Sequence, residues 1–246
     1  DQGHSPSTAL TTNGLGLEKR AGALAAAGLD RINVSLDTID RERYAALTRR
    51  DRLDHVLQAI AAADAAGLHP IKINAVVMPG VNEEDIVPLA DYAVHHGAQL
   101  RFIEQMPLGP REQWRREDMV TAEDILARLR THFSMESARE PRGSAPAALW
   151  EVSAPDGTRG TLGIIASVTH PFCGDCDRTR LTTDGAIRNC LFGNSETPLR
   201  DLLRSGASDE DIMEAWAGEM WTKKPGHGID DEGFLQPDRP MSAIGG

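Results

Sequence analysis

Residues 53–78, "LDHVLQAIAAADAAGLHPIKINAVVM", contain the unit that decides the fold. Val56 and Ile60 are four residues apart, the spacing of one apolar helix face, and Gly67 stands where a left-handed residue commonly ends a helix. Residues 71–77 then alternate apolar and other side chains, which is typical of a strand with two different faces. The stretch therefore predicts a helix, a glycine stop and a strand.

The same unit occurs twice more in the first hundred residues. A helical pattern over residues 17–29 leads to a strand pattern at 31–37, and a helical pattern over 83–97 leads to a strand pattern at 100–106. Helices and strands that alternate with short links predict a parallel sheet. The order of elements alone leaves a doubly wound sheet and a barrel both open.

The two faces of the predicted strands favour a barrel. One face of the strand at 31–37 carries Asn33 and Ser35, and one face of the next strand carries Lys72 and Asn74. A doubly wound sheet is covered on both faces, and its strands are nearly continuous apolar runs. A polar face on consecutive strands is expected where a barrel lumen holds a polar ligand. The alternative is the solvent-facing side of an edge strand.

The second half of the chain predicts a smaller module. Thr121, with Asp124 three residues later, has the pattern of a capping box before a helix at 122–133. Residues 136–148 are rich in proline, glycine and serine and predict a loop, so we expect one domain over 1–135 and another over 136–246. For the second domain we expect strands at 149–153, 161–169, 180–184 and 186–192, a turn at Asp184-Gly185, helices at 198–206 and 209–220, and a tail at 223–246 without periodicity.

Composition limits the classes of partner. The chain has 246 residues, of which 40% are hydrophobic and 26% charged, values ordinary for a globular protein. A net charge of −11 argues against nucleic acid as the main partner. We find no apolar run near the roughly 20 residues that cross a bilayer, and no signal-peptide pattern. We therefore expect a cytoplasmic protein without a membrane partner.

All three cysteines lie in "FCGDCDRTRLTTDGAIRNC", residues 172–190. Cys173, Cys176 and Cys190 form the pattern C-x2-C-x13-C, and an odd number of thiols in a reducing compartment favours metal ligation over disulfides. The site could be a structural zinc centre with His170 as fourth ligand. It could equally be an iron–sulfur cluster that leaves one iron without a protein ligand, or a chance group of structural thiols. The spacing does not separate these alternatives.

Two arginines follow the second cysteine. Arg178 and Arg180 alternate along an extended segment, so their guanidinium groups can point to the same side. The planar fork of arginine suits phosphate, and a basic pair next to a metal centre would hold an anionic ligand against the metal. The alternative is a pair of solvated surface arginines.

Several segments together resemble the GTP 3′,8-cyclase family of radical S-adenosylmethionine enzymes in molybdenum cofactor biosynthesis. The segments are "TTNGLGL" (11–17), "RINVSLDTID" (31–40), "IKINAVVMPGVNEEDI" (71–86), "RFIEQMPLG" (101–109), "FCGDCDRTRLTTDGAIRNCLF" (172–192) and "IGG" (244–246). They follow the family's order at about its spacing from near residue 8 to residue 246. The resemblance implies a partial (β/α)6 barrel whose open side is closed by a C-terminal region.

The resemblance also implies roles for individual residues. Cys173, Cys176 and Cys190 match the ligands of the family's C-terminal [4Fe–4S] cluster, whose open iron contacts the guanine of GTP. The positions that match GTP contacts are Thr11, Lys72, Arg178, Thr179 and Arg180. Ser35 and Met106 match contacts to S-adenosylmethionine, and Gly245-Gly246 match a tail that reaches toward the active site.

The chain departs from the family pattern at its start. Family members begin with C-x3-C-x2-C, which holds a second [4Fe–4S] cluster, and here no cysteine precedes Cys173. We therefore expect a fragment of a longer coding sequence, with an incomplete parallel (β/α)6 TIM-like barrel lacking its first two strands and a C-terminal α+β region.

The activity expected of the family is the conversion of GTP to 3′,8-cyclo-7,8-dihydro-GTP, which a fragment with a single set of three thiols would not perform. The second cluster is expected only in the full-length protein. The expected partners are GTP, S-adenosylmethionine and an electron donor that the sequence does not specify, and the chain could form a homodimer. The alternative function is a non-catalytic nucleotide- or zinc-binding module.

Overall fold

The computed structural model describes residues 6–108, 114–232, 234–237, 239 and 241–244. The chain packs as two compact units. The first is built from residues up to 105, from 119–142 and from 147–166, and the second from 106–118, 143–146 and the residues from 167 onward. None of the helices in these described ranges is long and apolar enough to cross a membrane.

The first unit contains one sheet of seven strands in its described part. The strands follow the order β1-β2-β3-β4-β7-β6-β5, in which β1 to β4 and β7 are parallel neighbours and β6 and β5 are antiparallel additions. The elements are β1 Ala9–Thr12, α1 Ala21–Ala26, β2 Arg31–Ser35, α2 Arg41–Thr48, α3 Leu53–Ala65, β3 Ile71–Val77, α4 Ile86–His95, β4 Gln99–Glu104, α5 Ala122–Arg130, β5 Ser134–Ser137, β6 Ala148–Ser153 and β7 Arg159–Ile165.

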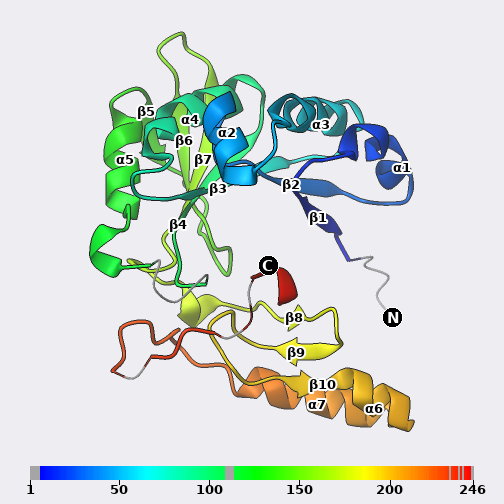
Figure 1. The fold of residues 1–246 in the computed structure, drawn as a ribbon. Coiled ribbons are helices and arrows are strands. Elements are labelled where there is room, and N and C mark those ends of the chain that lie inside the picture. The colour runs from blue at the N-terminus through cyan, green and yellow to red at the C-terminus, as the bar shows by residue number, and fades with distance from the viewer. Residues whose placement is uncertain (1–5, 109–113, 233, 238, 240, 245–246) are drawn as a thin grey trace. The chain divides into compact units, whose positions relative to one another are not determined.

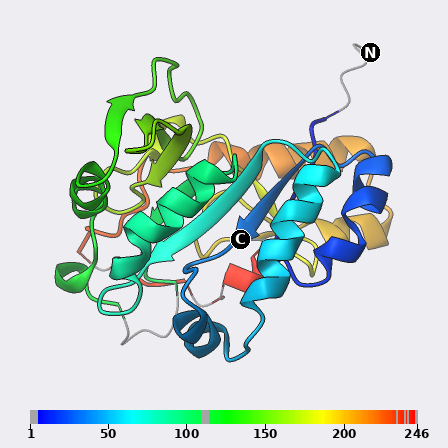
Figure 2. The same ribbon diagram turned by 90° about the horizontal axis from the view of Figure 1, so that it is seen from above.

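The core of this unit lies between the sheet and its helices. Figure 1 shows the helices along one side of the strands, and Figure 2 looks onto that helical side. In β3 the side chains of Ile71, Ile73 and Ala75 are buried, while Lys72 and Asn74 on the opposite face are only partly buried. Removing apolar area from water stabilises this packing, and the opposite face is left with polar side chains.

The three repeated units of helix and strand are confirmed. Each predicted helix gives α1, α3 or α4, and each is followed by β2, β3 or β4. Gly67 and Gly97 end two of these helices with φ of 76° and 65°, a conformation that glycine adopts without steric cost. The fold is therefore α/β with a mostly parallel central sheet. Among the described residues the sheet is open, with β1 and β5 at its edges, and no closed barrel forms.

Two strands expected in the smaller module instead extend the first sheet. β7 pairs in parallel with β4, with Leu162 opposite Leu100, and β6 pairs antiparallel with β7. The apolar run at 162–165 is buried, so its burial against the large core outweighs its place after the loop in sequence. The loop itself is found over 138–147, between β5 and β6.

The second unit is smaller and has a three-stranded sheet in its described part. Its elements are β8 Arg180–Leu181, β9 Ala186–Arg188, β10 Thr197–Pro198, α6 Leu199–Ser205 and α7 Asp209–Trp221. The predicted turn at Asp184-Gly185 is confirmed. The amide of Gly185 donates to the carbonyl of Thr182 at 2.9 Å, and Gly185 has a φ of 85°.

Candidate functional site

The three thiols are carried by one hairpin of the second unit. Cys173 begins a short 3₁₀ turn, Cys173–Asp175, and the amide of Cys176 donates to the carbonyl of Cys173 at 3.2 Å. The chain then enters β8, reverses at Asp184-Gly185 and returns along β9, so that Cys190 follows two residues after that strand. All three cysteines are free thiols and partly buried.

The thiols lie close enough to influence one another's ionisation. Burial raises the pKa of the Cys173 thiol, and the neighbouring Cys190 and Cys176 raise it further. At Cys176 burial also opposes ionisation, but hydrogen bonds from Arg178 hold the pKa of that thiol below its usual value. The side-chain bond runs from Arg178 Nε to Cys176 Sγ, at 3.4 Å. Of these two thiols, Cys176 is therefore the one that ionises more readily.

The donor set fits an iron–sulfur cluster by its chemistry. Within the described ranges no group of three or more His, Cys, Asp or Glu side chains is arranged to hold a metal ion. His170, the fourth ligand of the zinc alternative, is exposed, and its Nδ1 lies 3.1 Å from the hydroxyl of Thr169. A [4Fe–4S] cluster takes thiolate ligands and spreads three of them more widely than one tetrahedral ion does. The three thiols are therefore donors of the type that such a cluster takes.

The structure places both predicted arginines beside the thiols. The Arg178 guanidinium lies over the ring of Phe172, 4.7 Å from its centroid, as well as against Cys176. Burial lowers the pKa of Arg180, as does Arg178, while the neighbouring Cys190 and Cys176 act in the opposite direction. A partly buried guanidinium next to another cation gains from an anionic ligand, so this position suits a phosphate.

Thr179 points to a different partner. Its hydroxyl donates to Met220 Sδ on α7 at 2.8 Å. The backbone carbonyl of the preceding residue, Arg178, accepts a hydrogen bond from Lys223 Nζ at 2.6 Å. These contacts fix the segment between the second cysteine and β8 against the end of α7. The hydroxyl of Thr179, which is predicted to contact GTP, thus donates its hydrogen within the protein.

The predicted residues of the first unit share one face of its sheet. Thr11 on β1 is opposite Asn33 on β2, and Asn33 is opposite Lys72 on β3, so the three lie in one row. The side-chain amide of Asn33, through Nδ2, donates to the hydroxyl of Thr11 at 3.2 Å. Ser35 is two residues further along β2 on the same face, opposite Asn74. The structure therefore brings Thr11, Lys72 and Ser35 to neighbouring positions.

Two further cations on this face were missed by the sequence analysis. Burial lowers the pKa of Lys72 to about 8, and Arg101 on β4 and Arg31 on β2 lower it further. Burial and Arg31 lower the pKa of Arg101 in the same way. On β3, opposite Arg101, Asn74 Oδ1 is buried and has no hydrogen-bond partner among the described residues. Both arginines occupy the polar positions of their strands, so the period of two that identified Lys72 would have identified them.

This face carries excess positive charge. In the part of the chain that the structure describes, neither Lys72 nor Arg101 forms an ion pair with a carboxylate, and Arg101 donates only to Gln99 Oε1 at 3.3 Å. Cations that repel one another at a partly buried surface are stabilised by a multiply charged anion. The face has the chemistry of a phosphate site.

The remaining predicted positions are Met106 and Gly245-Gly246. Met106 follows β4, is partly buried and belongs to the second unit, where its carbonyl accepts from the amide of Leu108 at 2.8 Å. Gly245-Gly246 lie outside the described residues.

A cavity of about 570 Å³ adjoins Cys190. Its wall includes Phe192, whose ring centroid lies 5.3 Å from that of His227 and 6.2 Å from that of Phe234, and Lys224. Burial lowers the pKa of His227, although its Nε2 lies 2.9 Å from the carbonyl oxygen of Ser167. His227, Phe234 and Lys224 come from the aperiodic tail and Phe192 from the loop after β9, and apart from Cys190 none of these cavity residues was predicted as part of a site.

Two sequence families match this chain. The family described as Molybdenum Cofactor Synthesis C matches residues 98–229, and the Radical SAM superfamily matches residues 3–93. The first match covers more than half of the chain and includes the cysteine hairpin.

Similar proteins match over nearly the whole chain. A protein named GTP 3′,8-cyclase from Corynebacterium glutamicum (strain ATCC 13032) is 73% identical over 249 aligned positions, which cover 100% of this chain and 66% of the relative. A protein named GTP 3′,8-cyclase 2 from Mycobacterium bovis is 60% identical over 242 positions, which cover 98% of this chain and 67% of the relative. The chain thus spans about two thirds of the length of these relatives. Among solved structures, coproporphyrinogen III oxidase (HemN) from Escherichia coli matches with a TM-score of 0.39 and 10% identity, over 65% of this chain and 51% of that chain.

Proposed function

Because this chain belongs to the GTP 3′,8-cyclase family, we propose that the complete protein converts GTP to 3′,8-cyclo-7,8-dihydro-GTP with S-adenosylmethionine in molybdenum cofactor biosynthesis. The observation that carries the proposal is identity of 73% and 60% to proteins of that name over nearly the whole chain. The cysteine hairpin with its two arginines supports it from the structure.

In this proposal Cys173, Cys176 and Cys190 hold a [4Fe–4S] cluster. When bound, the cluster supplies an open iron that takes a ligand atom of the guanine base. The protein's own part is to fix the hairpin. The turn at Cys173–Asp175 and the β8–β9 pair present the thiols from two sides, and Arg178 balances the thiolate charge of Cys176.

The cationic side chains bind the phosphates of GTP in this proposal. Arg178 and Arg180 donate to phosphate oxygens beside the hairpin, which relieves the repulsion between the two guanidinium groups. Lys72 contacts GTP from the sheet, and Thr11 lies in its row. Thr179, which lies between the two arginines in sequence, is proposed to contact GTP as well. Holding the substrate in one orientation is the protein's contribution to a reaction whose difficult step belongs to the cofactor.

S-adenosylmethionine is proposed to contact Ser35 and Met106. In the complete protein the parallel strands β1 to β4 would be the last four of a partial (β/α)6 barrel, and a second [4Fe–4S] cluster would be held by cysteines outside the present 246 residues. A polar face of consecutive parallel strands supports this arrangement, because such a face suits a polar ligand.

The proposal is tested by the selectivity of the arginines. Replacing Arg178 or Arg180 by Ala in the cluster-loaded protein should weaken GTP binding by roughly 1.5–3 kcal/mol, the usual contribution of a hydrogen bond to a charged group. Calorimetry should show S-adenosylmethionine affinity unchanged in both variants. Arg200→Ala is the matched control, because Arg200 pairs with its neighbour Asp201 at 3.2 Å. This variant should leave the affinities for GTP and S-adenosylmethionine unchanged. Equal loss of GTP and S-adenosylmethionine binding in Arg178→Ala and Arg180→Ala would contradict the assignment.

A further inference from the structure

The buried guanidinium of Arg188 joins the two ends of the loop that carries Cys190. The Arg188 side chain is 3% exposed, pairs with Glu196 and donates to the carbonyl of Gly193. Arg188 is the last residue of β9, and Glu196 directly precedes β10. The ion pair therefore closes the loop at 189–196 on itself.

Cys190 lies inside this closed loop and is held from both sides. A Cβ placed on Gly193 would lie 3.6 Å from Cys190 Cβ, so the two residues are in close contact. On the other side the side-chain amide of Asn189, through Nδ2, donates to the carbonyl of Glu219 at 2.8 Å and to the hydroxyl of Thr222 at 2.7 Å. The position of the third thiol therefore depends on polar contacts made by its neighbours.

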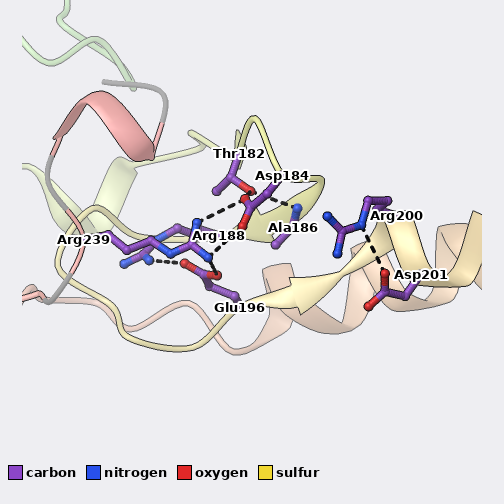
Figure 3. A network of polar contacts seen from close by, with 8 residues as sticks. All are labelled: Thr182, Asp184, Ala186, Arg188, Glu196, Arg200, Asp201 and Arg239. Atoms are coloured by element: carbon purple, nitrogen blue, oxygen red, sulfur yellow. Dashed lines mark hydrogen bonds and ion pairs between the residues drawn. The ribbon is translucent and has the colours of Figure 1, made fainter.

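A second arginine, Arg239 of the C-terminal segment, also contacts the carboxylate of Glu196. Arg239 donates to both oxygens of Asp184, at 3.1 and 2.9 Å, and its Nη2 lies 3.1 Å from Glu196 Oε2 (Figure 3). Asp184 lies in the turn between β8 and β9 and is also bonded by the hydroxyl of Thr182. Figure 3 shows Glu196 between the two guanidinium groups of Arg188 and Arg239.

We propose that Arg239 is a positioning residue that couples docking of the C-terminal segment, Arg239 and residues 241–244, to the placement of the Cys190 thiol. Glu196 shares its two oxygens between Arg188 and Arg239, so the loss of Arg239 removes one of two cations that hold this carboxylate. The segment also has an apolar anchor of its own, since Ile244 is fully buried. The contact with Glu196 therefore does more than fasten the segment: it connects the segment to the loop of the third cysteine.

The inference concerns the thiol itself and holds whether or not that thiol binds iron; only its importance for catalysis rests on the proposed function. The reaction of each thiol with iodoacetamide is therefore measured in the intact, reduced and metal-free chain, with peptide mass spectrometry to separate the three sites. The variants are Arg239→Gln, Arg239→Lys and Asp184→Asn. Arg200→Gln is the matched control, because its exposed pair with Asp201 lies near the hairpin but touches neither Glu196 nor Arg239 (Figure 3).

Arg239→Gln should raise the alkylation rate of Cys190 relative to Cys173 by about two- to fivefold, the change in local opening expected when a partly exposed ion pair is lost. Asp184→Asn should act in the same direction, Arg239→Lys should restore part of the protection, and Arg200→Gln should change nothing. Circular dichroism checks that each variant is folded.

Two results would overturn the inference. In one, the rate ratio stays constant in Arg239→Gln while hydrogen exchange at 241–244 increases, which means that Arg239 fastens the segment without acting on the thiol. In the other, all three thiols react faster by the same factor, which means a general loosening of the unit. A failure to bind iron would contradict the proposed function and leave this measurement intact, so the two failures are distinguishable.

Discussion

At the scale of single residues, Lys72 has the most informative environment. It lies on a face that also carries Arg31 and Arg101, and its pKa is lowered to about 8, first by burial and then by these two cations. An anion on this face would raise the pKa of Lys72, because it attracts the ammonium and offsets its repulsion by the two guanidinium groups. Lys72 molecules that carry the neutral amine should therefore take up a proton when a phosphate binds.

The first prediction is a loss of GTP affinity as the pH rises. The pKa of Lys72 is about 8 in the free protein and higher in the complex, so affinity is complete below about pH 8 and falls as the pH rises through that value. The Lys72→Arg variant keeps a positive charge at this position throughout this pH range. Because the titration of GTP itself affects both proteins equally, the ratio of their affinities depends on the charge of Lys72 alone. Measured by calorimetry, the ratio of wild-type to Lys72→Arg affinity should fall by up to about tenfold between pH 7 and 9. A constant ratio would show that the charge of Lys72 does not act on GTP.

At the scale of elements, the β8–β9 turn has a strict steric requirement. Gly185 has a φ of 85°, and a Cβ at this position would lie 2.6 Å from Arg200 Cβ, which is closer than real Cβ atoms approach. The amide of Arg200 also donates to the carbonyl of Gly185 at 2.9 Å. The turn that returns the chain toward the third cysteine is therefore packed directly against the start of α6.

The second prediction compares two glycines to separate the cost of a positive φ from the cost of the steric clash with Arg200. Gly206 ends α6 with a φ of 79° and has no atom within 4 Å of its added Cβ, so Gly206→Ala should destabilise by about 1–2 kcal/mol from backbone strain alone. Gly185→Ala should cost about 1–3 kcal/mol more, because Arg200 has to move. Urea unfolding followed by circular dichroism measures both. Equal losses would contradict the packing of the turn.

The third prediction concerns the start of α5. The hydroxyl of Thr121 accepts from the amide of Asp124 at 3.2 Å, and the carboxylate of Asp124 accepts from the amide of Thr121 at 2.9 Å, which confirms the predicted capping box. Thr121→Ala should lower the free energy of unfolding by about 1 kcal/mol. Thr131→Ala at the other end of the same helix is the control and should cost less, because its exposed hydroxyl only donates to the carbonyl of Arg128. An equal cost in both variants would argue against the cap.

Helix starts and turns were predictable from the sequence where the residues that form them lie within a few positions of one another. Thr121 and Asp124 are three residues apart, and Asp184-Gly185 are adjacent, so the sequence contains the whole of each signal. The pair of Arg188 with Glu196 spans eight positions, and that of Arg239 with Asp184 spans 55, and no short pattern marks either. Arg31 and Arg101 were predictable only in part. The alternation of side chains along a strand places both on the polar face, but their mutual repulsion arises from strand pairing, which the sequence pattern does not contain.

At the scale of the whole molecule, the arrangement of the sheet could not be derived from the order of segments. In sequence β5, the irregular loop at 138–147 and β6 all separate β7 from β4, yet β7 pairs with β4, and its hairpin partner β6 pairs in turn with β5. Pairing between strands distant in sequence is decided by the burial of both, which a single strand pattern does not contain. By contrast, the candidate ligands were predictable because the three cysteines lie within one hairpin.

The fourth prediction follows from the number of thiols in the chain. The 246 residues contain three cysteines, and a cluster held by three thiolates uses all of them. Prepared without oxygen, the chain should hold about four irons and four sulfides, and Ser at any of the three positions should remove them. With a strong reductant and S-adenosylmethionine it should release no 5′-deoxyadenosine, whereas the Corynebacterium glutamicum relative, assayed in parallel, serves as the positive control. Release of 5′-deoxyadenosine above background by the chain would mean that the hairpin cluster has a different role.

The alternation of the two units along the chain limits how the gene can exchange parts with its relatives. Residues 106–118 and 143–146 belong to the second unit, although the first unit continues to residue 166. A single recombination event at any point between residues 105 and 167 therefore combines two parental lineages inside at least one core. Substitutions that compensate one another within such a core have to be inherited together, so chimeras with one crossover in this interval should carry a penalty that grows with the divergence of the parents.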